Sequence, residues 1–144
     1  MEKIENVIKV AVAAFFSFFG MLAIPLLLLI SANILDWITG IIACKHRHEK
    51  LTSEKSFDGI TKKMGCYILV FIGFMTDVLI QYCISNLGLP IVFPTVVSCI
   101  VAVWLVCNEV ISVLENLVDI GVKLPPFLQP IIERISGETE NKLK

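Results

Sequence analysis

Charged residues are scarce in this sequence and absent from long parts of it. Only 17% of the 144 residues are charged and 56% are hydrophobic, whereas globular chains have about 25% charged residues. Residues 10–35 and 91–108 contain no charge, and Asp77 is the only charged residue within 64–89. Apolar runs of about 18 or more residues are typical of transmembrane helices. A soluble domain of this length could not bury three such runs, so the sequence predicts an integral membrane protein.

The sequence also lacks the motifs that carry most enzyme chemistry. It has no glycine-rich phosphate loop, no pairing of a nucleophile with a general base and no CxxC. Its five cysteines lie in or beside apolar runs, where cysteine behaves as a small hydrophobic residue, so a disulfide framework is not expected. Cys44, His46 and His48 form a short cluster, but a closed structural metal site needs four ligands. We therefore expect no enzyme, no metal and no other cofactor, and the net charge of −1 gives no sign of nucleic-acid binding.

The first apolar block is too long for a single crossing. As one straight helix, residues 10–44 would span about 52 Å at 1.5 Å per residue, and the hydrocarbon core of a bilayer is about 30 Å thick. Gly20 and Pro25 are expected to interrupt it, which predicts an N-terminal helix within 1–20 and a first span over 21–44. The block exceeds the core of a signal peptide, so we expect it to be retained.

The N-terminal helix has polar or small residues at every third or fourth position. This pattern predicts an amphipathic helix that lies at the membrane interface or packs its small face on neighbouring helices. The alternative is that the segment simply lengthens a tilted first span.

Two more spans follow, over 64–85 and 95–118. Pro94 could open the third span as its first helical residue, and Gly121 could end it. Prolines in the tail, residues 119–144, prevent a direct continuation, and a short amphipathic helix is expected there. The predicted fold class is all-α: one integral membrane domain with three transmembrane helices, an N-terminal amphipathic helix and a short C-terminal amphipathic helix.

The segment 45–63 between the first two spans is basic. It has six positive and three negative side chains, a net charge of +3 (6 − 3). Short loops rich in lysine and arginine stay in the cytoplasm, so we expect the N-terminus outside and the C-terminus inside, with three crossings. The residues expected to set this topology are Lys45, Arg47, Lys50, Lys55, Lys62 and Lys63.

Four acidic residues fall inside the predicted spans, namely Asp36, Asp77, Glu109 and Glu115. A charge at the centre of a membrane helix costs about 2.5–3.5 kcal/mol on insertion scales, and such residues usually face protein or water. The predicted spans offer them no lysine or arginine. We therefore expect these acids to be protonated, hydrogen-bonded between helices or exposed to water.

Polar residues gather on one face of the third span, where Asn108, Ser112, Glu115 and Asp119 stand at i, i+4, i+7 and i+11. The alternative is that the helix has left the bilayer by Glu115. In the first span, two polar residues three positions apart form a second face, which could meet the third span. The residues predicted to line a pore or join helices are Asp36, Thr39, Asp77, Asn108, Glu109, Ser112, Glu115 and Asn116.

Two stretches together resemble a known family. LDWITGIIACKHRHEKLTSEKSFDGITKKM (35–64) and NEVISVLENLVDIGVKLPPFL (108–128) are similar to the toxin-secretion/phage-lysis holins, which include holins of phages of Gram-positive bacteria. The resemblance covers about residues 32–132 and leaves out the N-terminal helix. The matching residues are Asp36, Trp37, Thr39, Gly40, Ser53, Gly59, Ile60, Lys62, Lys63, Asp77, Glu109, Ser112, Glu115, Asn116, Gly121 and Pro125.

This resemblance implies a small phage or prophage protein of the host's cytoplasmic membrane. Such proteins associate with themselves and with membrane lipid, and open a lesion that releases a wall-degrading endolysin or, in some relatives, a large toxin. Polar stripes suit this role, because they can be hidden between helices in a closed assembly and face water in an open one. Two alternatives remain open: a small ion or proton channel, and an inert antiholin-type partner of another holin.

Overall fold

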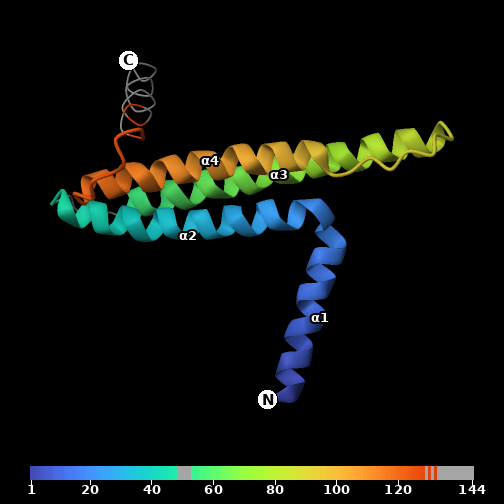
Figure 1. Cartoon of the computed structure of the whole chain (residues 1–144), viewed down its shortest axis with the longest axis horizontal. Coiled ribbons are helices and arrows are strands. Elements are labelled where there is room, and N and C mark those ends of the chain that lie inside the picture. Colours follow the sequence, from blue (N-terminus) through green and yellow to red (C-terminus); the bar gives the residue numbers. More distant parts are fainter. Residues whose placement is uncertain (49–52, 129, 131, 133–144) are drawn as a thin grey trace.

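The computed structural model describes residues 1–48, 53–128, 130 and 132 of the chain. All regular structure in these residues is helical (Figure 1). The elements in chain order are α1 (Glu2–Phe19), a short 3-10 turn (Gly20–Leu22), α2 (Ala23–His46), α3 (Ser53–Asn86) and α4 (Val96–Asp119).

Three helical stretches are long and apolar enough to cross a membrane: Glu2–His46, Gly59–Asn86 and Val96–Asp119. The shortest of them has 24 residues, which corresponds to about 36 Å at 1.5 Å per residue and exceeds a hydrocarbon core of about 30 Å. The prediction of an all-α protein is confirmed, with three helical stretches that could span a membrane. The amphipathic character of the N-terminal helix stays a prediction, and most of the tail in which the C-terminal helix was expected lies outside the described residues.

Helices α2, α3 and α4 run side by side, and α4 packs against both of the others (Figure 1). Their shared core is made of small and medium apolar side chains, a composition that lets membrane helices approach closely. Most of the larger apolar side chains point outward instead and are exposed, as expected for helices surrounded by lipid. The buried core consists of Leu22, Leu29, Val70, Cys99, Ala102 and Leu105.

The first apolar block bends at Gly20. This residue has φ 52°, a conformation that a side chain with a Cβ atom disfavours, and its backbone N–H donates to the Phe16 carbonyl. Leu22 and Ala23, directly after the bend, are buried and fix the start of α2. Pro25 does not break the chain, because it lies in the first turn of α2, where a missing N–H removes no helical hydrogen bond.

Two helix boundaries differ from the prediction. The segment 45–63 is not a loop throughout, since α3 already begins at Ser53; a polar helix that extends beyond the apolar span resembles a loop in composition. Pro94 precedes α4, whose N-cap is Thr95. The end of α4 is as expected, because Gly121 has φ 93° and the two hydrogen bonds of a Schellman motif close the helix.

Candidate functional site

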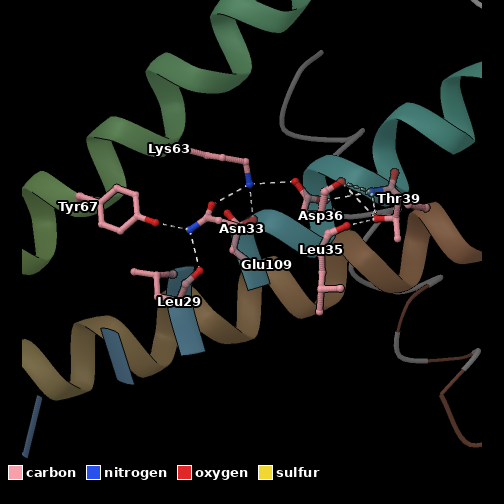
Figure 2. Close-up of polar contacts among 9 residues, drawn as sticks. Leu29, Asn33, Leu35, Asp36, Thr39, Lys63, Tyr67 and Glu109 are labelled. Atoms are coloured by element: carbon pink, nitrogen blue, oxygen red, sulfur yellow. Dashed lines mark hydrogen bonds and ion pairs between the residues drawn. The ribbon is translucent and has the colours of Figure 1, made fainter. Parts of the chain in front are cut away.

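The Lys63 side chain reaches from α3 into the space between the three long helices (Figure 2). Its amine donates to Asp36 Oδ2 on α2 at 2.9 Å and to Glu109 Oε2 on α4 at 2.5 Å. It also donates to Asn33 Oδ1 at 2.8 Å. The ammonium group is therefore held by three oxygens from two other helices, so this one side chain joins all three spans.

Asn33 connects this amine to the bundle core. It is only 7% exposed, and its Nδ2 donates to the Leu29 carbonyl at 2.9 Å and to the Tyr67 hydroxyl at 3.1 Å (Figure 2). Both ends of the amide are thus used, as a buried amide requires. The orientation of Asn33 fixes the oxygen that Lys63 needs.

Asn116 of α4 satisfies the other oxygen of Asp36. Its Nδ2 donates to Asp36 Oδ1 at 3.0 Å and lies 3.2 Å from Thr39 Oγ1, which donates to the Leu35 carbonyl at 2.8 Å. Gly40 lies beside this contact, and a Cβ at that position would be 3.6 Å from Asn116 Nδ2, an ordinary van der Waals distance. We name Asn33, Asp36, Thr39, Lys63, Tyr67, Glu109 and Asn116 the polar cluster.

The three ionisable side chains that meet in the polar cluster stand at one level of the bundle. Asp36 lies 10 positions before the end of α2, and Glu109 lies 10 positions before the end of α4. Lys63 lies 10 positions after the start of α3. This separation corresponds to about 15 Å at 1.5 Å per residue. With one ammonium and two carboxylates, the layer has an excess of one negative charge when all three groups are ionised.

The expectation that the acids of the spans have no cationic partner was wrong for Asp36 and Glu109. Lys63 was assigned only to the basic connection, yet it belongs to the stretch Gly59–Asn86 that can cross the membrane. Its side chain is 24% exposed, against 17% for Asp36 and 14% for Glu109. A lysine near the end of a span can bury its aliphatic stem and extend its amine several ångströms, so its own backbone position does not reveal where its charge lies.

The predicted polar stripe on α4 does not face the other helices directly; residues at one side of the stripe make the contacts. Glu109 and Asn116 point toward α2 and α3, whereas Asn108, the first residue of the predicted stripe, is exposed. Ser112 lines a cavity of about 270 Å³ beside the polar cluster. Glu115 is half-buried. The packing of the apolar core residues of α4 determines which side of this helix faces the bundle. The spacing of its polar residues does not reveal that side.

Asp77 forms a separate polar contact on α3. It is 3% exposed, and it accepts hydrogen bonds from the backbone N–H groups of Val97 and Ser98, both at 2.9 Å, and from the Ser98 hydroxyl at 2.6 Å. The carboxylate thus caps the N-terminus of α4 from a neighbouring helix, where a negative charge also complements the helix dipole. Gly73, one turn earlier, lets the backbone of α4 come close.

Other basic residues of the predicted topology signal are on the surface. Lys45, Arg47 and Lys62 are exposed, and Arg47 pairs with Asp119 at the ends of α2 and α4. Lys50 lies outside the described residues, and nothing is described of the Lys55 side chain. In the part of the chain that the structure describes, no three histidine, cysteine or acidic side chains are arranged to hold a metal ion.

Comparison with known proteins places this arrangement in a family. The family model described as "Bacteriophage holin family" matches residues 13–137. The chain belongs to the bacteriophage holin family. The match to this holin family covers all three long helices and the whole polar cluster, and the family is not enzymatic, which confirms that expectation.

Relatives that resemble the chain over most of its length include a "probable holin" of Bacillus phage phi105. It is 29% identical over 115 residues, which cover 80% of this chain and 76% of the relative. An uncharacterised protein of Listeria monocytogenes is 32% identical and covers 96% of this chain and 95% of its own. An uncharacterised protein of Clostridium perfringens is also 32% identical, with coverages of 96% and 99%. No solved structure matches the chain.

Proposed function

We propose that this holin-family protein assembles in the cytoplasmic membrane of a bacterial host and opens a lesion there. The lesion would let a wall-degrading endolysin, or a large toxin, leave the cell. Family membership supports the role. The observation that carries the proposal is the polar cluster, in which the charges of three apolar helices are held against one another inside a single protomer.

The polar cluster gives the protomer a closed form. With the helices together, Lys63, Asp36 and Glu109 satisfy one another and present little charge to lipid. If the helices separated in lipid, each charge would meet hydrocarbon at a cost of about 2.5–3.5 kcal/mol. Separation is therefore favourable only where water replaces the lost contacts, as along the wall of an aqueous lesion between several copies. The same residues would be hidden before opening and would line the path after it.

Self-association is supported by Asn108. It lies near the middle of α4 and is exposed on the outside of the bundle. A side-chain amide in hydrocarbon without a partner costs about 1–3 kcal/mol, and asparagine is a common hydrogen-bonding residue between membrane helices. A second copy would supply that partner. We expect Asn108→Leu to lower the oligomer fraction on native gels, while Val110→Leu, at an exposed position nearby, should leave it unchanged.

The orientation we propose is N-out and C-in. Exposed Lys45, Arg47 and Lys62 lie toward one end of the bundle, whereas residues 87–95 at the other end carry no charge. Lysine and arginine in short connections remain on the cytoplasmic side. An alkaline phosphatase fusion within 87–95 should be active and a fusion after residue 128 inactive. The reverse pattern would refute the orientation.

The function is tested by expression together with a cytoplasmic endolysin. We expect abrupt lysis with collapse of the membrane potential, and intact cells with a steady potential would contradict the proposal. Purified protein in vesicles should release a folded marker of endolysin size. Release of ions alone would indicate the channel alternative, which the pairing of Asp36 and Glu109 with Lys63 makes less attractive. Absence of lysis alone, with delayed lysis by a second holin, would indicate an antiholin.

A further inference from the structure

Helix α1 does not belong to the bundle. It leaves the start of α2 at a steep angle and projects away from α3 and α4 (Figure 1). None of its residues is buried, and every residue from Glu2 to Ala14 is exposed. Several of the exposed side chains are large and apolar: Ile4 and Val7 are 66% exposed and Ile8 is 57% exposed. Nothing in the described chain covers this surface.

Six apolar side chains of α1 share one face, whereas Val10, Val12 and Phe16 are exposed outside it. Positions 4, 7, 8, 11, 15 and 18 follow the helical repeat and carry isoleucine, valine, alanine and phenylalanine. The opposite face carries glutamate, asparagine, lysine, alanine and serine at positions 2, 5, 6, 9, 13 and 17. A helix with this division buries its apolar face when a surface is offered to it. We name positions 4, 7, 8 and 11 the apolar face of α1.

Near the bend, the side of α1 that carries the apolar face contacts the second span. The ring of Phe18, which continues the apolar face, lies 6.3 Å from the ring of Phe74 of α3, a residue within the second span. Phe19 packs against the bundle core. Across the bend, Ile24 is 61% exposed and Leu28 is 53% exposed, so the apolar surface of α1 continues into the lipid-facing surface of α2.

We propose that α1 lies in the plane of the membrane–water interface, on the side from which α2 enters. Its apolar face would rest on the acyl chains, and its polar face would stand among the headgroups. The occupant of the exposed face is thus lipid. The helix has two lysines and two glutamates, which cancel (2 − 2). Binding should therefore depend on apolar burial and be insensitive to anionic lipid. The inference needs only the membrane spans and is independent of lesion formation.

The test measures the depth of single tryptophans in the full chain, inserted in phosphatidylcholine vesicles. Trp37 and Trp104 are 60% and 59% exposed, so Trp37→Phe and Trp104→Phe give a background with few lost contacts. Ile4→Trp and Ala11→Trp are then added one at a time and quenched by lipids brominated at different depths. Both should report the same shallow depth, and adding phosphatidylglycerol to the vesicles should not change it. Lys9→Trp should instead be quenched by aqueous iodide.

A matched pair on α2 provides the scale. Leu28→Trp and Leu35→Trp have the same spacing on exposed positions, and their depths should differ by about 10 Å, because α2 crosses the bilayer at 1.5 Å per residue. A similar difference between the two α1 positions would mean that α1 spans, and would overturn the proposal. Protection from both lipid and aqueous quenchers would mean that a second copy covers α1, which overturns it equally.

Discussion

Removal of the Lys63 amine is the sharpest perturbation of the polar cluster. Lys63→Met keeps most of the side-chain volume and deletes the contacts to Asn33, Asp36 and Glu109. Removing one partner from a buried ion pair costs about 3–5 kcal/mol. Since the three charged side chains are 14–24% exposed, we expect the low end, about 3 kcal/mol. Because 1.4 kcal/mol corresponds to a factor of ten, the closed protomer should lose about a hundredfold in population relative to hydrated, open forms.

The assay is the time of lysis after induction together with an endolysin, at membrane levels matched by immunoblot. Lys63→Met should cause earlier lysis, because the closed form is weakened and the open form has water around these groups. Lys62→Met is the matched control: it removes the same charge from the adjacent, exposed position and should lyse at the normal time. The comparison shows whether a change in lysis time comes from loss of the polar cluster or from loss of one positive charge in the basic segment that sets the topology.

A neutral cluster supplies the second half of the test. The cost of Lys63→Met arises because two carboxylates keep their charge after their cation is removed. The triple variant Lys63→Met, Asp36→Asn and Glu109→Gln removes those charges as well, so its lysis time should return toward the normal value. If Lys63→Met and Lys62→Met behave alike, or if the triple variant lyses as early as the single one, the polar cluster does not hold the closed form and our reasoning is refuted.

Three predictions concern the stability of the bundle, measured by unfolding in mixed detergent micelles. Gly73→Ala would place a Cβ 3.0 Å from the Ser98 backbone and should destabilise by about 1–3 kcal/mol; Gly65→Ala, with nothing within 4 Å, should not, and equal effects would contradict the packing. Asp77→Asn halves the oxygens that cap α4 and should cost about 1–3 kcal/mol, so an unchanged midpoint would refute the cap. Arg47→Ala removes the exposed ion pair with Asp119 and should change stability by less than about 1 kcal/mol, which a larger loss would contradict.

The helices could be predicted because their causes are local. Long apolar runs, a glycine at the bend and a glycine after α4 each act within a few positions. The N-terminal edge of α3 could not be placed in the same way. Residues 53–63 are rich in polar side chains and were assigned to a connection, since composition does not distinguish a polar helical segment from a loop.

The order of the residues was enough to establish a membrane protein of three apolar spans, with acids inside them and a basic segment between the first two. It also singled out Asp36, Glu109 and Asn116 as unusual residues in those spans. The packing of the helices was needed to show that Lys63 is the partner of both acids and that Asn108 faces outward. The physical reason is that a long side chain carries its charge away from its own backbone, and that the rotation of α4 follows the packing of its apolar residues.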